Sequence, residues 1–444
     1  MSEEAAGPAV RRLADWSAAD LTDLADEYGT PLYVTDLDRV RENARRLLAA
    51  FPDADVRYAV KAHTGRAVLE TVRDAGLGAE CASAGEVVRA LDAGYDEVQY
   101  TAVNPPAEDL DVVLDRWRDG ADLTVVAGAR DTIERLRDRG FDGRLAIRVN
   151  PGVGAGHHEK VTTGGHAKFG VPYDRVPELL SGARADFDVV GIHAHAGSGI
   201  SGDQLDDHRE LVARMGNLAR EVGDLEFVDV GGGFGVPYHE DEPPLDLDAV
   251  ADATREALGD VGAELAIEPG RYLVADAGVL LTRVNTVKPV DGEGTDGTVP
   301  VVAGVDAGMT TLLRPAMYDA YHAIRNLTDE RPERPVTVAG PVCETSDLFC
   351  EERPMPTPRR GDCLAIGNAG AYGYEMASTY NSRPRPAEVV CEASETPREA
   401  SEERRSSGNR TQSGNGEAGG IGDDVRIARE RETLAHVTDL EVDR

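Results

Sequence analysis

The feature of this sequence that most constrains its fold is a regular alternation of short apolar runs with amphipathic stretches between residues 55 and 271. Short runs rich in β-branched residues are typical of buried strands, and apolar residues spaced three and four apart are typical of helices. Eight β/α units in this length predict a TIM barrel, which takes about 250 residues. The alternative is an open doubly wound sheet, but no G-x-G-x-x-G motif follows the first run. The eight predicted strands are 56–62, 77–83, 97–102, 122–128, 144–150, 187–197, 225–233 and 264–270.

After about residue 278 the pattern changes to short β-like runs separated by proline and glycine. This change predicts a second, all-β domain, built as a sandwich or a Greek-key-like barrel. The predicted fold class is therefore α/β, with residues 37–278 forming the (β/α)8 barrel and residues 1–36 plus 279–444 forming the β-domain. Residues 394–424 are rich in Ser, Gly and Glu, so we expect a disordered acidic loop there, without a catalytic role.

The charge of the chain excludes several classes of partner. The net charge is −34, with acidic residues along the whole sequence, and a surface of this kind repels nucleic acid and anionic membranes. Only four lysines accompany 43 arginines, and together with the charge this suggests a halophilic, salt-rich cytosol. No run approaches the ~18 apolar residues of a membrane span, so we expect a soluble, cytoplasmic protein. The five cysteines lack CxxC spacing, which argues against a disulfide framework or a zinc knuckle.

Chemically active side chains follow the predicted strands, where barrel enzymes carry their active sites. Lys61 closes the first strand between apolar neighbours, and desolvation there would lower its pKa and free the amine for Schiff-base chemistry. A surface lysine on the barrel rim is the alternative, which the rarity of lysine disfavours. Gly231, Gly232 and Gly233 close the seventh strand, where backbone N–H groups would bind a phosphate, and Ser198 could add a hydroxyl.

Two further groups of residues extend this pattern. His193 and His195 close the sixth strand. They could bind a metal, but stacking of an imidazole on a flat cofactor fits better because metallohydrolase barrels carry such a pair on the first strand. Glu268 and Arg271 close the eighth strand, either as a structural ion pair or as a carboxylate for a ring nitrogen and an arginine for an acid group. The whole set indicates pyridoxal 5'-phosphate and no metal.

Several longer motifs resemble those of the meso-diaminopimelate decarboxylase family, fold-type III enzymes related to alanine racemase. They are "YAVKA", "HAHAGSG", "GGGFG", "EPGR", "LLRPAMYDAYH", "GPVCETSDLF" and "GAYGYEMASTYNSRPRPAEV". The resemblance covers residues 30–393 and resumes near 425–440. It implies decarboxylation of meso-2,6-diaminopimelate to L-lysine and CO2, the last step of the diaminopimelate route of lysine biosynthesis. It also implies a homodimer with shared active sites and a small amino-acid substrate.

The resemblance also implies roles for individual residues. Lys61 would bind the cofactor covalently, His195 would stack on its ring, and Cys343 would return a proton to the substrate. Cys343 and Glu344 would reach into the partner subunit's site. The family usually has Asn where this chain has His63, and Gln where it has Gly199. The cofactor-binding set would be Lys61, His195, Ser198, Gly231, Gly232, Gly233, Glu268, Pro269, Gly270, Arg271 and Tyr372, and the substrate-binding set Arg271, Arg314, Tyr318, Glu344 and Tyr372.

Three alternatives stay open at the level of sequence. A related decarboxylase would act on ornithine, arginine or carboxynorspermidine, but Arg314 suits a second carboxylate and Glu344 follows Cys343. A non-catalytic pyridoxal-phosphate-binding relative is disfavoured by the β-domain and by the presence of Lys61, Glu268 and Cys343. A metal-dependent barrel hydrolase is the third. A carboxylate at the ring nitrogen favours decarboxylation over racemisation, because it keeps that nitrogen protonated.

Overall fold

The structure is a computed structural model of the 444-residue chain. It describes residues 8–101, 103–153, 169–195, 197, 200, 205–289, 299–328, 331–393, 422 and 424–442. The chain divides into two compact units. The barrel unit comprises residues 1–10, 40–237 and 241–275, and the β unit comprises residues 11–39, 238–240 and 276–444.

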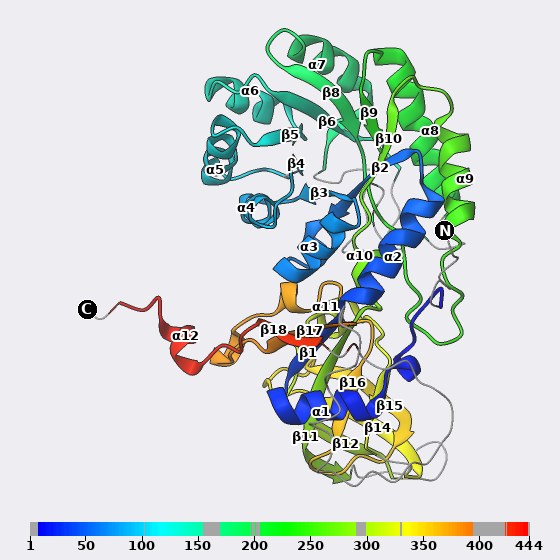
Figure 1. The fold of residues 1–444 in the computed structure, drawn as a ribbon, viewed down its shortest axis with the longest axis vertical. Helices are drawn as coiled ribbons and strands as arrows, with labels where there is room; N and C mark the ends of the chain where they lie inside the picture. Colours follow the sequence, from blue (N-terminus) through cyan, green and yellow to red (C-terminus); the bar gives the residue numbers. More distant parts are fainter. Residues whose placement is uncertain are drawn as a thin grey trace, which may run out of the picture. The chain divides into compact units, whose positions relative to one another are not determined.

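The barrel unit contains, within the described residues, a closed ring of eight parallel strands (Figure 1). The ring runs β5-β4-β3-β2-β10-β9-β8-β6, and pairing of β5 with β6 closes it. The predicted barrel and all eight predicted strands are thereby confirmed. A two-residue strand, β7 (Val171–Pro172), adds to β6. The ring consists of β2 (Ala54–Ala59), β3 (Gly78–Cys81), β4 (Glu97–Tyr100), β5 (Asp122–Ala127), β6 (Arg144–Asn150), β8 (Asp188–His193), β9 (Phe227–Asp229) and β10 (Glu264–Ile267).

Amphipathic helices alternate with these strands and bury one face each. Helix α2 (Leu37–Ala50) precedes the first barrel strand, and its apolar residues Leu37, Val40, Ala44 and Leu47 are buried. Side-chain caps fix some helix starts, as where Ser83 accepts a hydrogen bond from the Glu86 amide at α4. Besides α2, the helices of this unit are α3 (Arg66–Asp74), α4 (Ala84–Asp92), α5 (Ala107–Arg118), α6 (Arg130–Asp138), α7 (Val176–Ala183), α8 (Leu205–Val222), α9 (Leu247–Leu258) and α10 (Arg271–Val274).

The β unit is built on one connected sheet of mixed direction. Its main path is β15-β14-β12-β11-β1-β17-β18, and β16 pairs with both β11 and β13. The pairs β1–β17 and β12–β14 are parallel, whereas the other pairs are antiparallel. The strands are β1 (Leu32–Asp36), β11 (Gly278–Pro289), β12 (Val301–Val305), β13 (Ile324–Asn326), β14 (Glu333–Ala339), β15 (Leu348–Pro356), β16 (Cys363–Ile366), β17 (Ala387–Glu392) and β18 (Asp424–Arg429).

At β1 and β11 both faces of this sheet are buried, because neighbouring residues of these strands alternate between two hydrophobic clusters. Tyr33 and Leu280 belong to one cluster, and Leu32, Val34 and Leu281 to the other. Helix α1 (Ala18–Tyr28) contributes buried leucines to the second cluster. The unit also holds helices α11 (Arg314–Tyr318) and α12 (Leu434–Thr438), so the expected all-β domain is a mixed sheet with helices.

The expected acidic loop at 394–424 lies outside the described residues except for Gly422 and Asp424. Asp424 begins β18, which pairs antiparallel with β17. Among the described helices, none is both long enough and apolar enough to cross a membrane.

Candidate active site

Lys61 lies just beyond the first barrel strand, not within it. Strand β2 ends at Ala59, and Lys61 is the middle residue of a 3-10 turn, Val60–Ala62. Its apolar neighbours Val60 and Ala62 are buried, but the Lys61 side chain is 37% exposed and its Nζ lies 2.7 Å from Oε2 of buried Glu80. Lys61 therefore does not lie inside the apolar strand as expected: the turn carries the amine out of that strand, and a carboxylate pairs with it.

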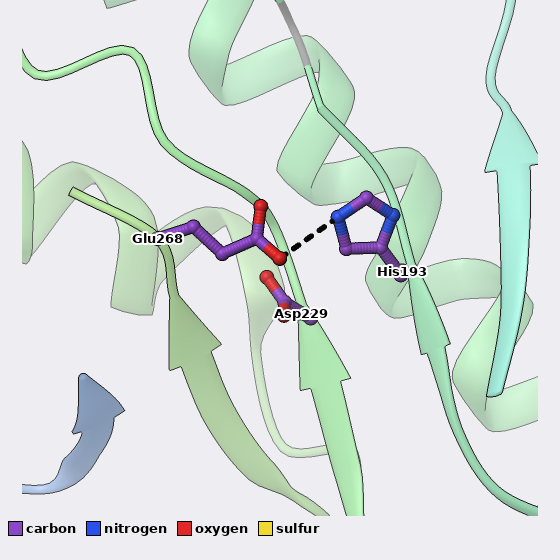
Figure 2. A group of neighbouring side chains, drawn as sticks. All are labelled: His193, Asp229 and Glu268. Carbon is purple, nitrogen blue, oxygen red and sulfur yellow. Dashed lines mark ion pairs between the residues drawn. The ribbon is translucent and has the colours of Figure 1, made fainter. Parts of the chain in front are cut away.

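Three side chains from adjacent strand ends meet inside the barrel (Figure 2). His193 ends β8, Asp229 ends β9 and Glu268 follows β10, and all three are buried. One potential ligand atom from each lies within 4.8 Å of the others. Gln99 of β4 bridges the carboxyls, since its Nε2 donates to Oε1 of Glu268 at 2.8 Å and to Oδ2 of Asp229 at 3.0 Å. An N–H donor directed at both carboxyls competes with any cation for their lone pairs, which argues against a metal site.

The environment of these side chains sets their protonation. Burial, and then the charge of nearby Glu80, raises the pKa of Glu268 to about 8. Burial, and then Glu268, raises the pKa of Asp229 to about 7. Burial lowers the pKa of His193 to about 4, so its Nε2, 3.1 Å from Oε1 of Glu268, belongs to a neutral ring. Among the residues that the structure describes, neither ring nitrogen of His193 has a hydrogen-bond partner with good geometry.

The glycines after β9 form a tight turn that is tied to these carboxyls. Gly231 has a φ of +74°, which favours glycine, and its amide donates to Oδ1 of Asp229 at 2.8 Å. A side chain at Gly232 would place its Cβ 2.2 Å from the Glu268 carbonyl oxygen. The Gly232 amide donates to Nδ1 of His195 at 3.1 Å, so the proton of this neutral imidazole resides on Nε2. Burial, and then Lys61, holds the pKa of His195 well below its usual range.

The segment after β10 packs against the end of β2, the first strand of the barrel. The amide of Ala59 donates to the carbonyl of Pro269 at 3.0 Å. Gly270 precedes α10, whose first residue is Arg271, and a Cβ at Gly270 would lie 3.1 Å from the Cβ atoms of Ala59 and Ala62. The barrel unit thus brings together Lys61, His195, the three glycines and Glu268–Arg271. Ser198 lies outside the described residues.

Within the β unit, Arg314 is buried and its orientation is fixed. Its Nη1 lies 2.8 Å from Nε2 of His322, and Nδ1 of His322 lies 2.8 Å from the Gly367 carbonyl oxygen. Because a guanidinium only donates, Nε2 of His322 accepts and its Nδ1 carries the proton. The Arg314 guanidinium also stands 4.8 Å from the centroid of the Tyr238 ring. Tyr318, at the end of α11, is partly buried.

Cys343 and Glu344 lie in an exposed loop of the same unit, beside a turn at 380–382. The Tyr380 hydroxyl donates to Oε1 of Glu344, and Nδ2 of Asn381 lies 3.6 Å from Sγ of Cys343. Buried Asp347 braces this loop by accepting from the amides of Met309 and Val342, both at 2.6 Å. Tyr372, partly buried, adopts a positive φ of 55°.

Comparisons with known proteins decide the family. Residues 37–275 match the family of the pyridoxal-dependent decarboxylase, pyridoxal binding domain. A diaminopimelate decarboxylase of Methanothermobacter thermautotrophicus is 44% identical over 399 residues, which cover 84% of this chain and 89% of the relative. One of Deinococcus radiodurans is 40% identical over 372 residues, with coverage of 83% and 92%. The chain belongs to the diaminopimelate decarboxylase family.

A crystal structure of a diaminopimelate decarboxylase extends this likeness to the whole fold. The enzyme from Helicobacter pylori, complexed with L-lysine, superposes with a TM-score of 0.79 at 30% identity and covers 95% of this chain and 98% of that chain. The predicted resemblance and the pyridoxal-phosphate cofactor are confirmed.

The residues of the barrel fit the cofactor of this decarboxylase family. An amine, Lys61, and a buried carboxyl, Glu268, project from neighbouring strand ends. The Glu268 carboxyl holds a proton to about pH 8, and a protonated ring nitrogen placed against it would return it to the ionised form. The neutral His195 suits stacking against a ring, since it brings no competing charge.

Sequence reasoning missed the polar residues that surround Glu268. Arg57, Glu80, Gln99 and Asp229 all lie in predicted barrel strands, and the last three are buried. The available signal was a polar residue in a predicted strand. Along a barrel strand, side chains alternate between the interior and the exterior, so such a residue can point inward. His63 was noted only as a departure from the family; its Nδ1 accepts from the Gly65 amide at 3.1 Å, just before α3.

Proposed function

We propose that this diaminopimelate decarboxylase acts on meso-2,6-diaminopimelate, releasing CO2 from one α-carbon and yielding L-lysine. The observation that carries the proposal is the barrel interior, where the Lys61 amine, neutral His195 and buried Glu268 gather around the glycine turn. Close similarity to decarboxylases of this substrate supports it. This reaction is the final step of the diaminopimelate route to lysine.

The barrel residues would hold pyridoxal phosphate and tune it. Lys61 would bond covalently to its aldehyde carbon, and His195 would pack on its ring. The glycine turn Gly231–Gly233 and the segment Pro269–Arg271 would hold the phosphate, with the Ser198 hydroxyl. The donors would be the amides of Gly233, Gly270 and Arg271, because those of Gly231 and Gly232 already donate to Asp229 and His195. Ionised Glu268 would keep the ring nitrogen protonated. The chemistry that the bound cofactor supplies is an electron sink for the pair that departing CO2 leaves on the α-carbon.

Residues of the β unit would recognise the substrate. The fixed, buried guanidinium of Arg314 suits the distal carboxylate, because it presents a preoriented positive charge. Tyr318 and Tyr372 would complete this contact, and Tyr372 would also meet the cofactor. Arg271, which belongs to the barrel unit, would bind the substrate as well. The carboxylate of Glu344 would pair with the distal ammonium, and ornithine lacks the distal carboxylate that Arg314 would bind.

We extend the proposal to a homodimer with shared sites, in which Cys343 and Glu344 serve the partner subunit. The exposure of both side chains, beside supporting contacts from Tyr380 and Asn381, supports this arrangement. The Cys343 thiol would give its proton to the α-carbon after CO2 departs, on the face that the partner's loop covers. The net charge of −34 supports a location in a salt-rich cytoplasm. It also argues against a nucleic-acid partner.

The decisive experiment is CO2 release from meso-diaminopimelate by the purified protein in molar KCl with added pyridoxal phosphate. We expect release from this substrate, and none from Lys61→Ala. Ornithine, arginine and carboxynorspermidine serve as parallel substrates. Release from one of them instead would overturn the roles of Arg314 and Glu344. No release from any, by a protein that binds the cofactor, would contradict the catalytic assignment and favour a non-catalytic relative.

A further inference from the structure

Gln99 is a buried amide whose two neighbours in the strand are also buried. It lies in β4 between Val98 and Tyr100 and is 2% exposed. Its Nε2 donates to Glu268 at 2.8 Å and to Asp229 at 3.0 Å, with Oγ1 of Thr101 at 3.2 Å. Its Oε1 accepts from Nη1 of Arg57. Because both polar atoms of Gln99 are hydrogen-bonded, the amide is buried without the cost of an unsatisfied polar group.

Arg57 determines which way this amide faces. A guanidinium only donates, so the Gln99 carbonyl must face Arg57 and the amide N–H groups must face the carboxyls. Arg57 is itself held, because its Nε donates to Oδ2 of Asp55 at 2.8 Å and its guanidinium lies 4.4 Å from the Phe227 ring centroid. A flipped amide would set its carbonyl oxygen against both Glu268 and Asp229.

The same network joins Glu268 to the glycine turn. Asp229 accepts from Gln99 through Oδ2 and from the Gly231 amide through Oδ1 at 2.8 Å. The Glu268 amide donates to the Gly231 carbonyl at 2.9 Å. Hydrogen bonds thus join the carboxyl proposed for the cofactor ring to the turn proposed for its phosphate.

We propose that Gln99, oriented by Arg57, is a positioning residue that holds the Glu268 carboxylate in one orientation for the ring nitrogen of pyridoxal phosphate. The proposal rests on the proposed role of Glu268. The contribution of Gln99 to cofactor affinity passes through the ring nitrogen, so we expect no such contribution for a cofactor that lacks this atom. A purely structural role would affect every cofactor equally.

The test measures affinity of the apoprotein for pyridoxal phosphate and for its 1-deaza analogue, in which C–H replaces the ring nitrogen. Gln99→Met keeps the length of the side chain and removes the amide. We expect it to weaken binding of pyridoxal phosphate by about tenfold, the effect of one hydrogen bond to a charged group, and to leave binding of the analogue unchanged. Arg57→Leu should reduce the same selectivity, and it serves as the second variant if Gln99→Met does not fold.

Asn43→Leu is the matched control, because Asn43 is another buried amide of the barrel unit and donates to the Leu273 carbonyl at 3.2 Å. It should leave the preference for pyridoxal phosphate over the analogue unchanged. Equal weakening of both cofactors by Gln99→Met, or no weakening, would overturn the positioning role. A wild-type protein that binds both cofactors equally would instead refute the role of Glu268, which separates failure of the premise from failure of the inference.

Discussion

At the scale of single residues, the barrel interior is a set of charges whose surroundings decide their chemistry. Lys61 is paired with Glu80, while Glu268 and Asp229 lie beside each other and hold protons that ordinary carboxyls release. Burial disfavours the charged form, and a second carboxyl nearby disfavours it further. In the apoprotein, ionisation of these carboxyls is therefore unfavourable, and a cationic ring beside Glu268 would make it favourable.

Glu268→Gln should flatten the pH dependence of stability of the apoprotein. The Glu268 pKa is raised from 4.5 to about 8 on folding, so its contribution is fully present below pH 4.5 and is lost as pH rises through 8. Between pH 6 and 9 the wild-type melting temperature should fall by a few degrees more than that of the variant. His193 has the opposite sign but is common to both proteins. Parallel melting curves for the two proteins would contradict the raised pKa.

His322→Ala should weaken substrate binding, because it removes the acceptor that fixes Nη1 of Arg314. We expect KM for diaminopimelate to rise by about five- to tenfold, the value of one hydrogen bond, with a smaller change in kcat. His322→Gln, which keeps an acceptor, is the control and should recover part of the loss. A fall in kcat at constant KM would argue against distal recognition by Arg314.

How much of this could be read from sequence depends on the residue. Lys61, His195 and Glu268 were identified because each follows a predicted strand, and strand ends are where barrels carry chemistry. Gln99 and Asp229 were not, because whether a polar residue inside a strand faces the interior depends on strand register and tilt, which one sequence does not fix.

At the scale of elements, the sequence pattern located the strands well and their ends poorly. Strand β2 was expected to run to residue 62 but ends at Ala59, since the apolar run continues through a 3-10 turn that has no period-two alternation. Strand β14 ends at Ala339, and the loop at 340–347 that follows it is ordered in part by a buried carboxylate, Asp347, which the sequence pattern did not reveal.

Asp347→Ala should loosen this loop and lower the stability of the β unit by about 2–4 kcal/mol, since the buried Val342 amide and the part-buried Met309 amide lose a charged acceptor. Hydrogen exchange at the Met309 and Val342 amides should accelerate more than tenfold. Asp347→Asn keeps one acceptor oxygen and should give a smaller effect. Unchanged exchange at both amides in the alanine variant would show that other contacts order the loop.

At the scale of the whole molecule, the acidic surface is the feature that composition alone revealed. Helix α9 illustrates it, with Asp248, Asp252 and Glu256 exposed at successive intervals of four residues. Like charges at this spacing repel one another, and salt screens them: the Debye length falls from about 10 Å at 0.1 M to about 3 Å at 1 M.

Lowering KCl from about 2 M to 0.2 M should therefore reduce the melting temperature by several degrees or more. The triple variant Asp248→Asn, Asp252→Asn, Glu256→Gln should depend less steeply on salt than the wild type. An equally steep dependence would mean that salt acts through general exclusion from the surface and not through these charges.

The distribution of cysteines gives the chain a built-in attachment point for a spectroscopic reporter. Cys343 is exposed, whereas Cys81, Cys350, Cys363 and Cys391 are buried. A maleimide spin label or fluorophore would therefore react at one position of the native sequence without prior mutagenesis. Because Cys343 is also the proposed proton donor, the label should block CO2 release, and two labels in a dimer would report the distance between the paired loops of the inactivated protein.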